Sequence, residues 1–93
     1  MTYLYLGSVY MFLASGSRIS ILEGPYAGQK GWVECIAFQH PTGSNERCHC
    51  YQAKLESGKW INVRTCGVAP GWLNDEDMAW MIEMLPRLTF PKD

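Results

Sequence analysis

Hydrophobic and polar positions alternate on both sides of a glycine-containing segment in the first forty residues. Ile19 and Ile21 flank Ser20, and a second run begins with Val33 and Ile36. Alternation with a period of two is typical of a strand that buries one face. The pattern therefore predicts a strand, a loop and a second strand, with Ser20 on the polar face.

A second pair of alternating runs follows the polar loop 39–47. Ser57 and Gly58 supply a turn between the two runs. When such runs pair as a hairpin, alternate residues face opposite sides of the sheet. The expected inward set is Tyr51, Ala53, Leu55, Ile61 and Val63, and the outward set includes Lys54, Trp60, Asn62 and Arg64. Gly67, Pro70 and Gly71 are expected to end the strand region, which gives four or five strands.

The hydrophobic period changes near the end of the chain. Asn74 precedes three acidic residues, which is typical of a helix N-cap with acids in the first turn. Pro86 is expected to end this helix. A hydrophobic stripe at helical spacing is expected to pack on the sheet, and it consists of Met78, Met81, Ile82 and Leu85. Trp80 and Met84 are expected on a flanking face of the helix.

The first seventeen residues carry no charged side chain. They lack the basic start of a secretory signal and are too short to cross a bilayer, so we expect a cytoplasmic protein that does not enter a membrane. Tyr3 and Tyr5 alternate with leucines, which predicts an extra strand within residues 1–15. An uncharged edge strand of this kind is also an expected contact for a homodimer.

Glycines occur at fixed offsets in the first loop. The run Gly24-Pro25-Tyr26-Ala27-Gly28 is followed after two residues by Gly31, and then by Val33 and Ile36. Glycine permits a positive φ or the close approach of another chain segment. In its spacing of glycines and aliphatic residues, the segment 19–36 resembles the KOW motif of L24- and L26-type ribosomal proteins and NusG-class elongation factors.

The resemblance implies a fold and a class of function. In that family the motif forms two strands and a loop of a small SH3-like barrel that binds RNA, DNA or another protein. We therefore expect a mainly β fold, a small SH3-like β-barrel with one short C-terminal α-helix. Residues 1–93 would form one domain, with an N-terminal strand segment at 1–15, the barrel at 16–72 and the helix at 73–86.

Charge is divided unevenly along the chain. The net charge is −1, but residues 1–72 hold six Lys or Arg against four Glu, whereas residues 73–93 hold two against five acidic residues. A domain that depends on phosphate contacts usually has a basic face and a high pI, and the pI here is about 6.1. Charge therefore favours a protein or nucleoprotein partner over nucleic acid alone.

The expected binding surface joins the first loop to the hairpin. Tyr26, Gln29 and Lys30 are placed at the tip of the loop. The outward positions extend the surface, and they are Trp32, Lys54, Trp60, Asn62 and Arg64. Trp and Arg are enriched in protein interfaces, so the leading hypothesis is a non-catalytic module that docks onto a polymerase, a ribosome or a similar complex, with an inhibitor encoded by a phage or mobile element as one form of it.

Three alternatives remain at this point. Lysines near Trp32 and Trp60 would allow direct binding of RNA or DNA. A zinc site is a second alternative, although the spacing lacks paired C-x-x-C motifs; the ligand types available are Cys35, Cys48, Cys50 and Cys66 with His40 and His49. The outward placement of Trp32 would also be reversed by a bulge after Gly31. We expect no cofactor, no metal and no enzyme activity, because no catalytic motif is present.

Overall fold

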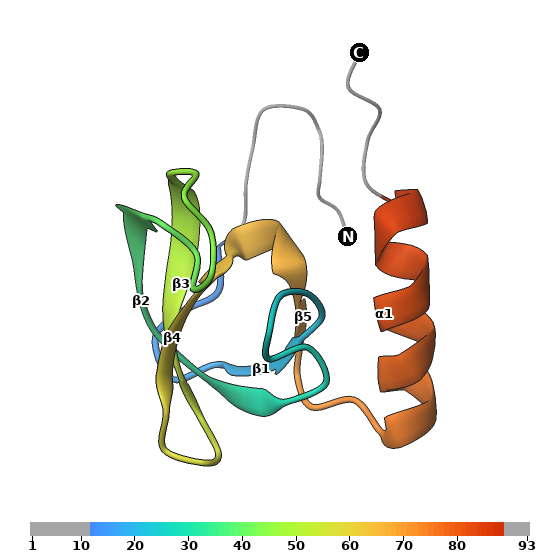
Figure 1. Cartoon of the computed structure of the whole chain (residues 1–93). Helices are drawn as coiled ribbons and strands as arrows, with labels where there is room; N and C mark the ends of the chain where they lie inside the picture. The colour runs from blue at the N-terminus through green and yellow to red at the C-terminus, as the bar shows by residue number, and fades with distance from the viewer. Residues whose placement is uncertain (1–11, 89–93) are drawn as a thin grey trace.

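The computed structural model describes residues 12–88, which form one sheet and one helix (Figure 1). The strands are β1 (Arg18–Ile21), β2 (Lys30–Gln39), β3 (Cys48–Leu55), β4 (Trp60–Arg64) and β5 (Val68–Pro70), with a 3-10 turn, η1 (Thr65–Gly67), before β5 and the helix α1 (Asp75–Leu88) after it. All neighbouring strands are antiparallel, in the order β4-β3-β2-β1-β5. The predicted fold class, a small mainly β domain with one C-terminal helix, is confirmed.

The five-stranded sheet is strongly curled, and its concave side holds the main core. Within residues 12–88 the two edge strands β4 and β5 do not pair with each other, so the curl encloses the core without a continuous ladder. Eight buried side chains fill this core: Ile19, Ile21, Val33, Tyr51, Ala53, Leu55, Ile61 and Val63. Burial of apolar area is the dominant favourable contribution to folding, so this cluster stabilises the sheet.

The hairpin β3–β4 has the predicted register. Tyr51 lies opposite Val63, and Ala53 lies opposite Ile61. All four side chains are buried, whereas Trp60 is exposed. The short turn before Trp60 fixes this register, because a slip of one residue would expose the whole apolar set.

The strand β1 is buried on both of its faces, which corrects the prediction of a polar face at Ser20. Ser20 is fully buried. Its hydroxyl donates to the Gly71 carbonyl at 2.8 Å and accepts from the Leu73 N–H at 3.0 Å. The chain after β5 therefore crosses the convex face of β1. The prediction was wrong because local alternation carries no information about a distant segment.

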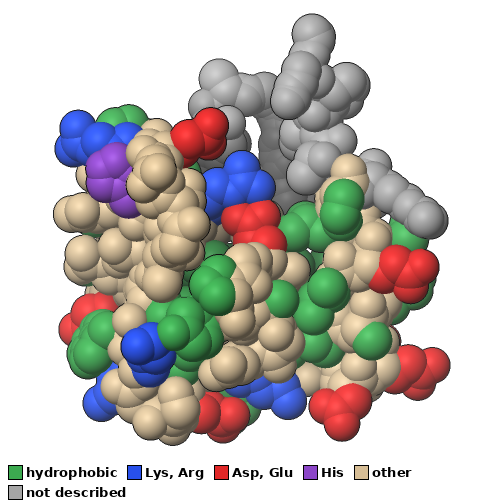
Figure 2. All heavy atoms as spheres, viewed as in Figure 1, with side chains coloured by type: hydrophobic (Ala, Val, Ile, Leu, Met, Phe, Trp, Pro, Cys, Tyr) green, Lys and Arg blue, Asp and Glu red, His purple; other side chains and the backbone are tan. Residues whose placement is uncertain are grey.

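The helix α1 packs on the sheet through the predicted stripe. Leu22, Ala69 and Met78 form a second buried cluster, and the half-buried residues around it are Leu73, Met81, Ile82 and Leu85. The Asp77 N–H donates to the Asn74 side-chain oxygen at 2.7 Å, which confirms the N-cap. On the face shown in Figure 2, acidic side chains lie over the helix and also over the strands and loops, whereas Lys and Arg side chains lie mainly over the strands and loops.

The helix continues beyond Pro86 to Leu88, so the prediction that Pro86 ends it was wrong. Proline removes one backbone hydrogen bond and restricts the preceding residue. Here it lies in the last turn, where few further hydrogen bonds depend on it. Within residues 12–88, α1 is neither long nor apolar enough to cross a membrane.

Gly67 is also placed differently from the prediction, because it lies in η1 and one more strand, β5, follows it, whereas Pro70 is the last residue of β5 and ends the strand region as expected. As β5 is an edge strand, the missing N–H of proline is tolerated there. The predicted N-terminal strand, and with it the predicted dimer contact, falls mostly on residues outside the described part of the chain. Residues 12–17 contain no strand, and the Leu13 N–H donates to the Tyr51 hydroxyl at 2.9 Å.

The glycines of the first loop have the two roles expected of them. Gly24 and Gly28 have φ values of 83° and 94°. Gly31 instead lies where β2 approaches β3 so closely that a Cβ atom would overlap the Lys54 carbonyl oxygen. The loop shape and the strand pairing therefore both depend on the absence of a side chain.

Replacing Gly31 by alanine is expected to lower the free energy of unfolding by about 2 kcal/mol, because the added methyl group overpacks the contact between two paired strands. Gly24→Ala is the matched control. Space is open around Gly24, so only backbone strain of about 1 kcal/mol is expected there. Chemical denaturation of both variants checks the ranking, and a Gly31→Ala variant as stable as the wild type would contradict the close approach.

Candidate functional site

Aromatic and basic side chains form a line across four strands on the convex face of the sheet. Arg18 lies opposite Trp32, Trp32 opposite Lys54, and Lys54 opposite Trp60. Residues directly opposite one another in a sheet point to the same face. Their chain neighbours on the other face are buried in the core, so this line points outward. We call Arg18, Trp32, Lys54 and Trp60 the aromatic–basic row.

Trp72, from the connection after β5, joins one end of the row. Its ring lies 5.2 Å from that of Trp32 in an edge-on arrangement, and the Arg18 guanidinium lies 4.8 Å from the Trp72 ring centroid. The Trp72 ring N–H also donates to the Gly31 carbonyl at 3.0 Å. These contacts hold Trp32 in a fixed orientation, although it remains 36% exposed.

Trp60 lies at the other end of the row, on the edge strand β4. It is 55% exposed, and the Lys54 ammonium lies 5.8 Å from its ring centroid. A cation over an aromatic face is attracted by the ring, although an exposed pair contributes only a fraction of a kcal/mol to about 1 kcal/mol. The bulge in β2 lies between Val33 and Cys35, beyond Trp32, so the outward placement of both tryptophans is confirmed.

The row contains three of the predicted site residues and Arg18, which the sequence did not indicate, and the adjoining Trp72 was not indicated either. Arg18 is two residues from Ser20 in β1, so both side chains point to the same face of the strand. The pairing of β1 with β2 is needed to identify that face as the convex one. Trp72 lies outside any alternating run. Its position depends on the contacts of Ser20 with Gly71 and Leu73, which are more than fifty residues away along the chain.

The three predicted residues of the first loop do not form an exposed tip together. Tyr26 is half-buried against the main core, and the Lys59 ammonium lies 5.7 Å from its ring centroid. Gln29 is exposed, but its backbone carbonyl accepts from the Ile21 N–H at 2.8 Å. Lys30 is half-buried and begins β2, so its alternation places it on the same face as the row.

Asn62 holds a neighbouring loop against the outer edge of β4. Its side-chain amide donates to the His40 carbonyl at 3.2 Å, and its backbone N–H donates to the Thr42 hydroxyl at 2.9 Å. Its backbone carbonyl accepts from the Thr42 N–H at 2.8 Å. The loop thus covers an edge that would otherwise present unpaired backbone groups.

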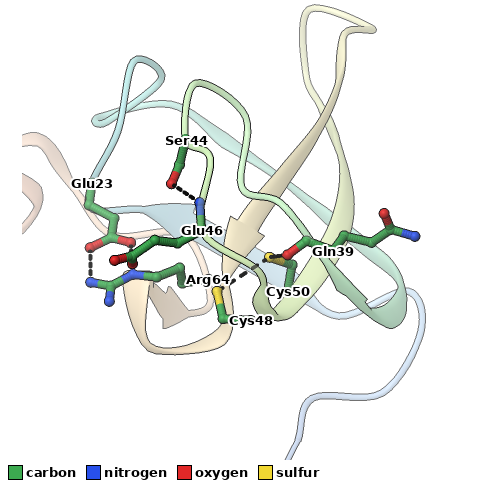
Figure 3. Close-up of polar contacts among 7 residues, drawn as sticks. All are labelled: Glu23, Gln39, Ser44, Glu46, Cys48, Cys50 and Arg64. Atoms are coloured by element: carbon green, nitrogen blue, oxygen red, sulfur yellow. Dashed lines mark hydrogen bonds and ion pairs between the residues drawn. The ribbon is translucent and has the colours of Figure 1, made fainter.

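Arg64 forms a two-point ion pair with Glu23 from the loop after β1 (Figure 3). The Nε and one terminal nitrogen of Arg64 donate to the two carboxylate oxygens at 2.6 and 2.7 Å. Hydrogen bonding to Glu23 raises the pKa of Arg64. The pair joins β4 to the first loop, so Arg64 contributes to the curl of the sheet and lies apart from the row.

Replacing Glu23 by glutamine is expected to lower the free energy of unfolding by about 1 kcal/mol or less, because Arg64 is partly exposed and solvent screens the pair. The loss should shrink at high salt. Denaturation at two salt concentrations measures it, with Glu56→Gln at an exposed position as the control. Equal losses in the two variants would contradict a specific role for the pair.

Two of the four free thiols lie together on β3 (Figure 3). The sulfurs of Cys48 and Cys50 are 3.9 Å apart, and the Cys50 thiol donates to the Gln39 carbonyl at 3.5 Å. The predicted shared face of Cys48 and Cys50 is confirmed. Burial, followed by the neighbouring Cys48, raises the pKa of Cys50 to about 11.

The thiols of Cys48 and Cys50 do not form part of a complete zinc site. A structural zinc site takes four protein ligands. Residues 12–88 contain no group of three or more His, Cys, Asp or Glu side chains arranged to hold a metal ion. Cys35 is exposed and donates to the Gln52 side chain at 2.8 Å, and Cys66 is also exposed.

The raised pKa of Cys50 predicts a loss of stability at high pH. The unfolded thiol ionises near its ordinary pKa of 9.0, whereas the folded thiol ionises at about 11. Between these values the unfolded state binds fewer protons, so the free energy of unfolding falls as pH rises. Denaturation at pH 8 to 11 should show a steeper fall for the wild type than for Cys50→Ala. Parallel curves would contradict this assignment.

Comparison of the chain with protein-family models, with curated proteins and with solved structures finds no match. The resemblance to the KOW family therefore stays a prediction, which rests on the residues between Ile19 and Ile36.

Proposed function

We propose that the chain is a non-catalytic binding module that docks onto a protein or nucleoprotein complex through the aromatic–basic row. The leading support is the exposure of Trp32 and Trp60 on one face, with Lys54 between them. Large apolar side chains exposed together mark interaction surfaces. Trp and Arg are also the residues most enriched among those that dominate binding energy.

The rigidity of the row supports the same function. Trp32 is held by Trp72, and Trp60 extends from a strand of fixed register. Side chains that are already oriented lose less conformational entropy on binding, so more of the contact energy appears as affinity. Trp60 is the more exposed ring, which makes it the expected anchor.

Charge supports a protein or nucleoprotein partner. The chain has a net charge of −1, and α1 carries Asp75, Glu76, Asp77 and Glu83. These acids would repel a long polyanion that approached the helix side. Non-specific binding of nucleic acid depends on neutralising several phosphates, and this chain has few cations for that purpose.

The resemblance of residues 19–36 to the KOW motif suggests where such a partner would be found. A polymerase, a ribosome or another complex that processes nucleic acid in the cytoplasm is the partner class that it implies. An inhibitor encoded by a phage or mobile element is one form of this proposal, because a small module without catalysis would act by stoichiometric blocking.

Direct binding of single-stranded RNA or DNA is a second candidate. One observation favours it, namely the alternation of cation and ring along a single register line from Arg18 to Trp60. Bases can stack on tryptophan rings while basic side chains contact phosphates, and such stacking contributes about 1–3 kcal/mol per base.

Replacing Trp60 by alanine is expected to weaken partner binding at least tenfold, by about 2 kcal/mol, while the melting temperature stays close to that of the wild type. The matched control is Trp80→Ala, since Trp80 is also 55% exposed but lies on α1. Affinity capture from a lysate of the source organism, followed by titration of the retained complex, measures the effect.

The same capture separates the two candidate functions when it is repeated with nuclease and at two salt concentrations. Retention of a protein complex after nuclease, lost only with Trp60→Ala, would support protein docking. Binding of oligo(dT) or oligo(U) that falls with salt, with a slope reduced by about 1 in Lys54→Gln, would support the second candidate. Equal binding by the Trp60→Ala and Trp80→Ala variants would contradict the row as the contact surface.

A further inference from the structure

The strand β2 extends well beyond β1, the strand that pairs with it on one side. It has ten residues, whereas β1 has four. The Val33 N–H donates to the Ser17 carbonyl at 2.9 Å, and the Val33 carbonyl accepts from the Gly16 N–H at 2.7 Å. Beyond the bulge after Val33, β2 pairs within residues 12–88 only with β3. The end of β2 is therefore an edge of the sheet, and in Figure 1 it lies at the margin of the molecule.

The direction of the backbone groups along this edge follows from the ladder. In an antiparallel pair, residues that exchange hydrogen bonds with their partner alternate with residues whose groups point away. The Leu55 N–H donates to the Lys59 carbonyl, so the odd-numbered residues of β3 face β4 and the even-numbered ones face β2. Ala37 lies opposite Cys50 and is bonded to β3.

Ile36 and Phe38, on either side of Ala37, therefore point their backbone groups away from β3. The Arg47 guanidinium donates to the Phe38 carbonyl at 3.3 Å, and a carbonyl oxygen has a second lone pair. Within residues 12–88 the N–H groups of Ile36 and Phe38 and the Ile36 carbonyl have no hydrogen-bond partner. Such groups are a template for pairing with another strand.

The side chains at this edge are apolar and accessible. Ile36 is 36% exposed and Phe38 is 47% exposed. No Lys, Arg, Asp, Glu or Pro occurs between Cys35 and Gln39, so the strand itself lacks the charges and prolines that usually prevent pairing. The Arg47 guanidinium lies over the Phe38 ring, 4.9 Å from its centroid, so one positive charge is held beside the edge.

We propose that this edge pairs with the same edge of a second copy of the chain, antiparallel, with the two-fold axis at Ala37. Ile36 would then lie opposite Phe38 of the partner subunit. Each of these two equivalent pairs would exchange two backbone hydrogen bonds. The sheets of the two copies would become continuous through β2.

The edge fits a second copy because a two-fold axis at Ala37 places Ile36 of each copy opposite Phe38 of the other. The outward-pointing backbone groups are placed symmetrically about Ala37, and a β-branched residue meets an aromatic one, which is a favourable cross-strand pair. At the axis the two Ala37 residues would form a non-hydrogen-bonded pair, whose Cα atoms approach to about 4.5 Å. Alanine is small enough for this approach, and residues 35–39 carry no charge of their own.

The dimer would leave the aromatic–basic row uncovered. Trp32 precedes the bulge in β2, and Lys54 and Trp60 are in register with Trp32 on the next two strands. The proposed contact lies after the bulge. Each dimer would thus present two rows, which raises the apparent affinity for a partner with two sites. The dimer proposal stands without the proposed function, since it depends only on the edge.

Sedimentation equilibrium of the full chain over a wide concentration range tests the proposal. The apparent mass should rise from the 10.6 kDa of one chain towards twice that value. Ile36→Lys should weaken association at least tenfold, because it places a charge within the apolar contact, and it should leave the melting temperature nearly unchanged. Trp80→Lys, which changes a hydrophobic residue on α1 that is more exposed than Ile36 (55% against 36%), should associate like the wild type.

Amide NMR shifts of the wild type provide a second test that does not depend on how the variant folds. The amide signals of Ile36 and Phe38 should shift with concentration, while that of Trp60 should not. A chain that stays monomeric at every concentration would overturn the proposal. A dimer that Ile36→Lys leaves intact would also overturn it, as would an equal loss of association in Trp80→Lys. Protection of both edge amides from exchange in the monomer would overturn it too, because another segment of the same chain would then pair with the edge.

Discussion

The short strand β1 is covered on both faces, and the other elements depend on how each face is covered. Ile19 and Ile21 enter the main core on the concave side. On the convex side, the Ser20 hydroxyl binds the backbone of Gly71 and Leu73, and this contact brings the end of the chain across the sheet. A buried hydroxyl without partners would cost free energy, so the two hydrogen bonds fix the path of this crossing. Trp72 and the start of α1 are positioned as a consequence.

The bulge after Val33 divides the sheet into two regions with different properties. Before it, β2 lies between β1 and β3, and the aromatic–basic row extends over a rigid surface. After it, β2 has only one neighbouring strand within the described residues, and the apolar side chains of Ile36 and Phe38 become accessible. One local irregularity therefore separates a surface that is suited to a partner from an edge that is suited to strand pairing.

The parts of the fold that follow from local rules could be predicted from the sequence. The hairpin parity placed Trp60 outward and Tyr51 inward, since a tight turn and an apolar face fix the register together. Asn74 caps the helix as its side-chain chemistry predicts. The parts that could not be predicted involve distant contacts: the burial of Ser20, the position of Trp72 on Trp32, and the pairing of Arg64 with Glu23. Alternation places a residue on a face of a strand, but it does not say what covers that face.

The size of the row limits what a single copy can do. Trp32 has part of its surface occupied by Trp72, so Trp60 and Lys54 offer most of the free contact area. A stable protein interface usually involves some twenty to thirty residues on each side, and a few anchors within it supply most of the energy. A row this small is suited to anchoring, with other surfaces of the domain completing the contact. Two rows on one dimer would add the effect of high local concentration, so modest affinity at each row is compatible with firm attachment to a partner that offers two sites.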